Sequence, residues 1–239
     1  VVAAGRSGNR LLSTKLLCGA GPGLQAADVV ICSVYPAATL DFVKSAVPFL
    51  KSDVLITDAT GIKGSLPEDV QRLLTGRMEF IAGHPMAGRQ GSGLGMSQAE
   101  IFDGANYIVV PAAFNSSGAI EWLSSFAGAI GCGQVVQVDA VEHDRIIAYT
   151  SNLPHALAVA LINSASYNEN TKYFIAGSFR DGTRVADINP YLWSDLFLAN
   201  REKRSAGISC IQPAVGTLAR SADSCRRAGP AGNDAGSCG

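Results

Sequence analysis

Short apolar runs rich in β-branched residues recur through the first half of the chain, alternating with segments whose apolar residues lie three and four positions apart. The runs predict strands and the intervening segments predict amphipathic helices, a pattern typical of an α/β fold with a parallel sheet buried on both faces. The expected strands cover residues 1–4, 28–34, 53–59, 79–83, 106–111 and 133–139. The expected helices between them cover residues 37–50, 66–74 and 119–130.

After residue 139 only helical periodicity remains. Residues 140–166 and 189–203 predict helices, the second with Asn189 as its cap and Pro190 in its first turn. We therefore expect a partial, Rossmann-type parallel sheet over residues 1–139, followed by an all-helical domain over residues 140–204. The remaining residues, 205–239, are rich in Gly, Ser, Ala and Arg without an apolar stripe, and they predict a disordered tail.

The composition is that of a soluble globular protein. The chain has 239 residues, of which 47% are hydrophobic and 16% charged, which is enough to bury a sizeable core. A net charge of -1 does not favour nucleic acid or an anionic membrane as a partner, and no apolar run is long enough for a membrane span. The six cysteines show no metal-type spacing, so we expect free thiols in a reducing cytoplasm and no metal site.

A histidine at the end of a predicted parallel strand suggests a dinucleotide site, which needs a glycine-rich loop directly after a strand. The glycines of "GAGPGL" and "GSGLG" do not meet that requirement, because no predicted strand precedes them, and both segments predict turns. We therefore expect the first strand and its glycine loop to lie upstream of Val1 in a truncated or frame-shifted chain. The unusual composition after Arg204 agrees with this expectation.

In that register residues 1–10 form the second strand and its turn, where an acidic residue would bind the adenosine ribose. The turn instead reads Gly5, Arg6 and Ser7. An arginine here accommodates a 2′-phosphate and favours NADP over NAD, whereas an arginine in a solvated turn explains the sequence equally well.

Two further loops follow predicted strands and are candidates to face the cofactor. Val34 and Pro36 lie in "CSVYP", and Ala59 and Thr60 lie in "DATGIKG". Ligands in open α/β sheets bind outside the carboxyl ends of the strands, so these residues are placed to contact NAD or NADP. Taken alone, each loop is also an ordinary strand-to-helix connection.

The chain has three histidines, and their positions differ. His84, in "GHPMAGRQGSG", ends a predicted strand and so faces the ligand-binding edge of the sheet. His155 follows Pro154, which interrupts a helical pattern, and a structural role suits it as well as a ligand-binding one. His143, in "EHD" at the start of a helix, is expected to be a surface or capping residue.

Arg180 and Arg184 lie four apart in "GSFRDGTRVADINPYLW". On one helical face the two guanidinium groups would suit a substrate with carboxylates, through bidentate pairing. A solvated face with an Arg-Asp pair is the ordinary alternative, and the pattern alone slightly favours it.

Four segments in this order, "TDATGIKG", "GHPMAGRQGSG", "HDRIIAYTSNLPHALAVAL" and "GSFRDGTRVADINPYLWSDLFLANREK", resemble the prephenate and arogenate dehydrogenases of tyrosine biosynthesis. The resemblance covers residues 25–204 and implies a nucleotide-binding domain followed by a helical dimerisation domain, hence a homodimer. It also implies an oxidative decarboxylation. Hydride leaves C4 of the cyclohexadienol ring for NAD or NADP, the C4 hydroxyl loses its proton, and carbon dioxide departs as the ring becomes aromatic.

The resemblance also assigns roles to individual residues. It makes His84 the histidine that hydrogen-bonds the C4 hydroxyl, and it makes His155 and Arg184 the substrate-binding histidine and arginine. The other residues expected at the substrate are Ser92 and Gly93, in a loop that closes over the ligand, together with Thr60 and Ser151.

Three positions depart from the family pattern. Gly61 stands where many members have serine, with Thr60 as a neighbouring hydroxyl. Gln90 replaces a frequent acid, and Asn152 replaces the first histidine of "SHLPH". Together with the missing glycine loop, these departures leave an alternative: a catalytically inactive relative or fragment that binds a ligand or a partner without turnover.

Overall fold

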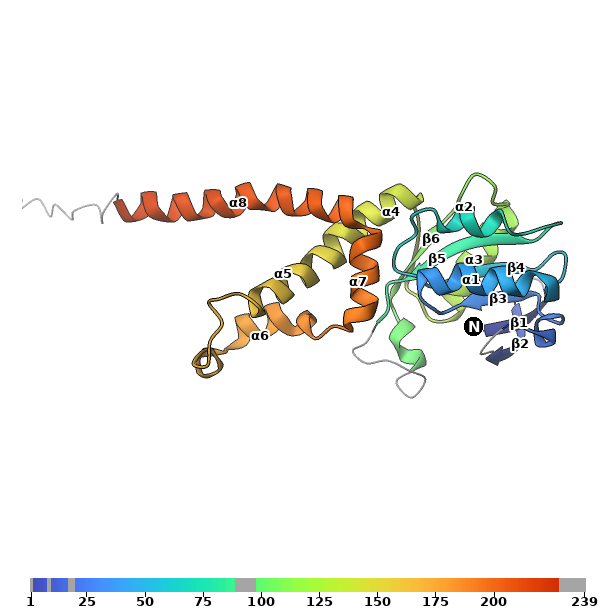
Figure 1. Cartoon of the computed structure of the whole chain (residues 1–239). Helices are drawn as coiled ribbons and strands as arrows, with labels where there is room; N and C mark the ends of the chain where they lie inside the picture. The colour runs from blue at the N-terminus through green and yellow to red at the C-terminus, as the bar shows by residue number, and fades with distance from the viewer. Residues whose placement is uncertain (1, 8–9, 17–19, 89–97, 228–239) are drawn as a thin grey trace, which may run out of the picture.

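The computed structural model describes residues 2–7, 10–16, 20–88 and 98–227. Within them a seven-stranded sheet, in the order β2-β1-β3-β4-β5-β6-β7, is followed by helices alone (Figure 1). The strands are β1 (Val2–Ser7), β2 (Arg10–Leu16), β3 (Val29–Cys32), β4 (Leu55–Asp58), β5 (Glu79–Pro85), β6 (Asn106–Val110) and β7 (Gln134–Gln137). The α-helices are α1 (Pro36–Ala46), α2 (Leu66–Gln71), α3 (Ser117–Ala129), α4 (Ala140–Ile147), α5 (Leu153–Ile162), α6 (Gly177–Thr183), α7 (Pro190–Ala199) and α8 (Arg201–Arg227).

The centre of the sheet is parallel. β3 pairs parallel with β4, and β4 with β5, so their carboxyl ends lie at one edge. β6 is antiparallel to β5, and β7 is parallel to β6. The predicted α/β class, a Rossmann-type sheet followed by a helical part, is confirmed. The reversal of β6 departs from an all-parallel sheet.

Side chains along the central strands alternate between two cores. α1 and α2 cover one face of the sheet, and α3 covers the other (Figure 1). The first core includes Val30, Ile56 and Phe80, and the second includes Val29, Leu55 and Ile81. Because both faces are covered, successive residues of each strand are apolar, which explains the continuous apolar runs of the sequence.

The first two strands differ from the prediction. β1 runs antiparallel to β3, with Val2 opposite Ile31, and then pairs antiparallel with β2. Gly5, Arg6 and Ser7 therefore belong to β1 and lie toward the amino end of β3. The prediction that they form a turn at the carboxyl edge of a parallel sheet is wrong. An apolar run predicts a strand, but its direction depends on the strand with which it pairs.

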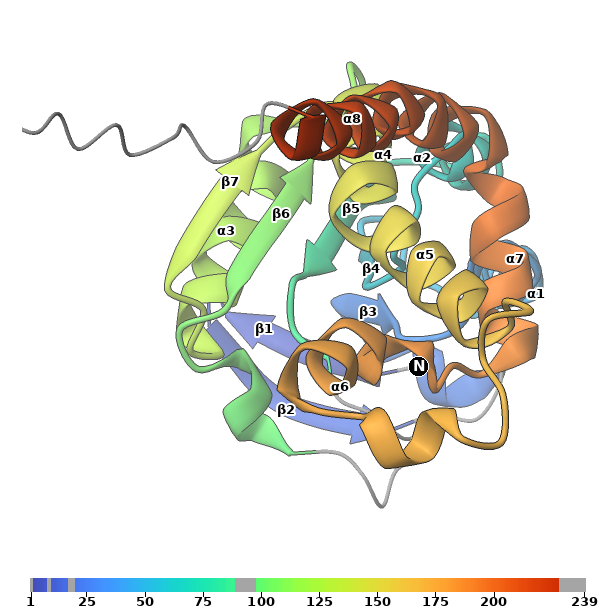
Figure 2. The same cartoon turned by 90° about the vertical axis from the view of Figure 1, so that its left-hand side faces the viewer.

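The helical part begins with one continuous helical segment. α4, a π-helical segment (Ala148–Asn152) and α5 follow one another without a break. The wide π turn directly precedes Pro154, whose nitrogen has no proton to donate to the carbonyl of Thr150. α6 and α7 then return beside α5, as Figure 2 shows.

The predicted tail is helical over much of its length. α8 continues to Arg227, so the prediction of disorder is wrong for residues 205–227, and residues 228–239 lie outside the described residues. Alanine and arginine favour helix, and the first turn of α8 is anchored by the Arg204 guanidinium, 4.8 Å from the centre of the Phe197 ring. Across the described ranges, no helix is long and apolar enough to cross a membrane.

Candidate active site

A buried ion pair holds the ends of β4 and β5 together. Lys63 Nζ lies 2.7 Å from Asp58 Oδ2, and both side chains are 0% exposed. The same ammonium group donates to the Gly83 carbonyl at 2.6 Å, and the Gly83 amide donates to Asp58 Oδ1 at 3.1 Å. Burial lowers the pKa of Lys63, although the Asp58 carboxylate opposes that change. The residue directly after Gly83 is therefore held on a rigid support.

Position 83 accepts only a glycine without rearrangement. A Cβ atom built there would lie 2.5 Å from the hydroxyl oxygen of Tyr107 and 3.0 Å from its ring. Tyr107 comes from the neighbouring strand β6 and is buried. The glycine therefore lets β5 and the tyrosine ring pack closely beside His84.

His84 is partly buried and faces a second histidine. Its Nδ1 lies 2.9 Å from Nε2 of His143 in α4. Burial lowers the pKa of His84 to about 3, and the positive charge of Lys63 contributes to this. His84 is therefore neutral near pH 7, which is the state that a proton acceptor requires.

Asp144 completes this cluster and joins α4 to the loop after β4. Its Oδ1 lies 2.8 Å from Nδ1 of His143 and accepts the Lys63 amide at 2.9 Å. Its Oδ2 accepts the Gly64 amide at 2.8 Å. Burial favours the neutral acid, but the hydrogen bonds from His143 and the two amides hold the pKa of Asp144 below its usual value. Asp144 is thus an ionised carboxylate inside the protein.

A second cluster surrounds His155 on α5. Its ring stacks on Trp193 of α7, with centroids 3.7 Å apart, and its Nδ1 donates to the Ser151 carbonyl oxygen at 2.8 Å. Burial lowers the pKa of His155, and the nearby positive charge of Arg184 lowers it further. The structure therefore brings together His155, Arg184 and the backbone of Ser151, three positions proposed from the sequence.

One face of α7 connects the two clusters. Trp193, Leu196 and Asn200 are spaced three and four apart, so they lie on the same side of the helix. Leu196 and the His84 ring both lie beside Gly61, since a Cβ built at Gly61 would be 3.9 Å from each. Asn200 donates to the Asp144 carbonyl at 2.9 Å and to Asn152 Oδ1 at 3.0 Å. The two clusters therefore border one site.

Two positions differ from what the sequence analysis expected. The Thr60 hydroxyl is buried and hydrogen-bonds Asp58, with the Ile62 carbonyl 3.2 Å away, so it does not face a ligand. His143 is 2% exposed and lies inside the cluster, so its prediction as a surface or capping residue is wrong. In both cases the local pattern showed a polar residue but not the buried partner that it binds.

Sequence reasoning missed Asp58, Lys63, Asp144 and Trp193. A usable signal was present for the first two, because a charge at the end of a continuous apolar strand must find a partner when the sheet is covered on both faces. The predicted loop residues Ser92 and Gly93 lie outside the described residues. Groups of three or more residues that could hold a metal ion are absent from the described ranges.

Two family models match the chain in succession. The prephenate dehydrogenase nucleotide-binding domain matches residues 18–136, and the prephenate dehydrogenase dimerization domain matches residues 139–222. The chain belongs to the prephenate dehydrogenase family. This confirms the resemblance inferred from the four sequence segments.

Individual relatives agree with this family. The prephenate dehydrogenase of Bacillus subtilis (strain 168) is 31% identical over 183 residues, covering 75% of this chain and 49% of the relative. The cyclohexadienyl dehydrogenase of Zymomonas mobilis is 36% identical over 180 residues, covering 73% and 60%. The solved A. aeolicus prephenate dehydrogenase, in complex with hydroxyphenyl propionate and NAD+, gives a TM-score of 0.73 at 28% identity, covering 82% of this chain and 71% of that one. The chain thus spans about half to three fifths of the length of these two curated relatives.

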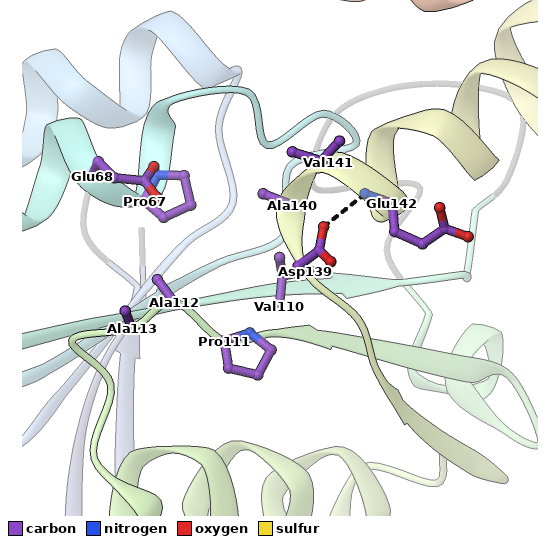
Figure 3. Close-up of a pocket in the computed structure, with 10 residues that line it drawn as sticks. All are labelled: Pro67, Glu68, Val110, Pro111, Ala112, Ala113, Asp139, Ala140, Val141 and Glu142. Atoms are coloured by element: carbon purple, nitrogen blue, oxygen red, sulfur yellow. Dashed lines mark hydrogen bonds between the residues drawn. The ribbon is translucent and has the colours of Figure 1, made fainter.

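A separate pocket of about 470 Å³ lies between α2, the end of β6 and the start of α4 (Figure 3). Its charged lining residues are all acids, namely Glu68, Asp139 and Glu142. Asp139 caps α4 by accepting the Glu142 amide at 2.9 Å. Three carboxylates would repel an anion, so this pocket does not suit a ligand that carries carboxylates.

Proposed function

We propose that this chain catalyses the oxidative decarboxylation of prephenate, or the corresponding oxidation of arogenate, with NAD or NADP as hydride acceptor. The observation that carries the proposal is the setting of His84. It is a neutral imidazole at the carboxyl edge of the central strands, and its Cε1 and Nε2 atoms lie beside Gly61. The absence of a side chain at Gly61 leaves space next to the nitrogen that His143 does not engage.

Each side chain then has a distinct task. Nε2 of His84 accepts the proton of the substrate hydroxyl, while Arg184 pairs with a substrate carboxylate. His155 and Trp193 form a stacked surface against which the ring of the substrate packs. Aromatisation supplies the driving force, so the protein mainly orients the ring and accepts one proton.

The described residues fit the nicotinamide side of a dinucleotide. Val34, Pro36 and Ala59 follow β3 and β4 at the edge where His84 lies, and all three are partly exposed. When bound there, NAD or NADP would supply the hydride acceptor. Among the residues that the structure covers, no strand leads into a helix through a loop with the glycine spacing that cradles a pyrophosphate. We therefore assign residues to the nicotinamide side alone.

The proposal extends to a homodimer formed through the helical part. α5 is apolar on nearly every side, yet Leu157 and Leu161 are each 48% exposed. A helix of this kind is normally buried, and the match to a dimerization domain makes a second copy of this chain the expected cover.

The domain division and the compartment are part of the same proposal. We place the division near residue 139, because β7 ends at Gln137 and α4 begins at Ala140. Cys32, Cys132 and Cys210 are free thiols, which agrees with a reducing compartment such as the cytoplasm.

The decisive experiment measures reduction of NAD and NADP by the purified chain with prephenate and with arogenate. His84→Asn is expected to lower kcat by about 100-fold or more, since general base catalysis contributes roughly that much, with KM nearly unchanged. Arg184→Ala is expected to raise KM by about 10-fold to 100-fold, because it removes a charged hydrogen bond to the carboxylate.

Binding of hydroxyphenyl propionate, measured by calorimetry, gives a readout that does not depend on turnover. It should weaken in Arg184→Ala and persist in His84→Asn. A folded chain that binds this compound but reduces neither nucleotide would support the inactive relative instead. Normal turnover in His84→Asn would remove the role assigned to that histidine.

A further inference from the structure

We propose that His143 and Asp144 are positioning residues, which place the proton of neutral His84 on Nδ1 and so leave its Nε2 free to accept the substrate proton. This inference rests on the proposed function, since it adds two residues to the same site. It is carried by the row of hydrogen bonds that runs from Asp144 through His143 to His84, and by the burial of the first two residues.

Asp144 is the first residue in this row of hydrogen bonds. An ionised carboxylate has no proton and only accepts hydrogen bonds. Asp144 accepts from the amides of Lys63 and Gly64 and lies 3.4 Å from the Lys203 ammonium group, so each contact on its oxygens comes from a donor. The His143 nitrogen at 2.8 Å must therefore also be a donor, which places a proton on Nδ1 of His143.

Both rings are neutral imidazoles in this proposal, each with one proton on its two nitrogens. With Nδ1 of His143 protonated, Nε2 of that ring is an acceptor. Nδ1 of His84, at 2.9 Å, must then donate to it, which leaves Nε2 of His84 without a proton. The opposite tautomer would bring a bare His143 nitrogen against the Asp144 carboxylate, two acceptors at 2.8 Å inside the protein. A doubly protonated His143 would instead donate to His84 and place the His84 proton on Nε2, which the measurement below distinguishes.

The location of His143 makes this arrangement specific. His143 is 2% exposed and Asp144 is 1% exposed, so water does not replace either hydrogen bond. Asp144 is also anchored to the loop that follows β4, and Asn200, which directly follows α7, donates to the Asp144 carbonyl. These two contacts connect the row of hydrogen bonds to the loop after β4 and to the end of α7.

The same row stabilises the state that follows proton transfer. When the substrate hydroxyl gives its proton to Nε2 of His84, the ring becomes a cation that still donates from Nδ1 to His143. The negative charge of Asp144, held on the far side of His143, favours that cation and keeps the ring in its orientation. Within the row only one proton is gained, at Nε2 of His84, and Nδ1 of His84 keeps its own proton.

The test is nitrogen-15 NMR of the imidazole rings in the purified chain, without a histidine tag. The chain has three histidines, so single substitutions assign every ring. We expect the Nδ1-H tautomer for His84, although an isolated histidine side chain prefers Nε2-H. His155 is the internal reference, because its Nδ1 donates to a carbonyl and should not respond to changes at position 143.

Two variants separate positioning from packing. His143→Phe removes the acceptor, and we expect loss of the Nδ1-H preference at His84 and a fall in kcat of about 10-fold or more, with KM within about 3-fold. His143→Gln offers an amide oxygen to the same Nδ1-H, so it should restore the tautomer and part of kcat.

An Nε2-H tautomer of His84 in the unmodified chain would overturn the proposal, and this measurement requires no variant to fold. An unchanged His84 tautomer in a folded His143→Phe chain would also overturn it. An inactive chain that shows the expected tautomer would contradict the proposed function while leaving the positioning role intact.

Discussion

The helices α3 and α5 are both strongly apolar, and the two halves of the molecule cover them differently. α3 buries Trp122 and Leu123 against the sheet, where they are 2% and 0% exposed. α5 leaves Leu157 and Leu161 about half exposed on the helical part. The α/β half therefore completes its own core, whereas the helical part presents an exposed apolar surface, which the proposed homodimer would cover. An apolar helix predicts burial but does not reveal what buries it.

The two halves also meet where polar groups are buried. Most of the buried polar residues lie around His84; among the residues that the structure describes they are Thr39, Thr57, Asp58, Thr60, Lys63, His143, Asp144, Asn152 and Asn200. Burying such groups is costly unless each finds a partner, and the hydrogen bonds of Asp144 and Asn200 supply partners across the junction. The junction thus combines the rigid support of one half with side chains from the other.

The largest expected effect tests the interior of the α/β half. Lys63→Met leaves the buried Asp58 without its cation, so the free energy of unfolding should fall by about 3–5 kcal/mol, as measured by urea denaturation. Lys51→Met is the matched control, because Lys51 pairs with Asp28 at 2.6 Å with both side chains about one third exposed. It should change stability by less than about 1 kcal/mol. Equal losses in the two variants would contradict the buried pair.

A smaller effect is expected from crowding the strand that carries His84. Gly83→Ala forces a methyl group against Tyr107 and should lower the free energy of unfolding by about 1–3 kcal/mol. Gly128→Ala is the control, and its effect on the free energy of unfolding should have the opposite sign. Gly128 lies in α3, and a Cβ there has no neighbour within 4 Å. It should raise stability by about 0.5–1 kcal/mol, measured in the same way. If Gly83→Ala left the free energy of unfolding unchanged, β5 and β6 would not be packed this closely.

The smallest effect on stability should come from the exposed face of α5. The pair Leu157→Ser and Leu161→Ser should change the free energy of unfolding of each subunit by less than about 0.5 kcal/mol per substitution, yet shift the chain toward monomer in sedimentation. Val136→Ser on β7 is the control, because Val136 is 40% exposed but belongs to the α/β half. If the dimer persisted in the α5 variant and dissociated in the β7 variant, the dimer surface would lie on the α/β half and not on α5.

Much of the α/β half could be predicted because its signals are local. The central strands were found from continuous apolar runs, since residues buried on both faces must be apolar whatever the rest of the chain does. The position of His84 at a strand end and the start of α7 at Pro190 followed from equally short patterns. The family resemblance rested on four such segments, and the two family matches confirm it.

The remaining features depend on partners that are distant in the sequence. Pairing alone decided that β1 runs antiparallel to β3, and this removed Gly5, Arg6 and Ser7 from the cofactor edge. α8 departs from the prediction for a local reason, since alanine and arginine favour helix over residues whose composition indicated disorder.

By itself, then, the sequence determined which segments are buried in the sheet and that His84 stands at the carboxyl end of a central strand, because burial and strand ends leave a local pattern of side chains. Only the tertiary structure decided that His143 lies against His84, 59 positions away, and that Lys63 neutralises Asp58 in the interior. A buried charge or imidazole is tolerated only beside a matching partner, and that partner is chosen by the fold.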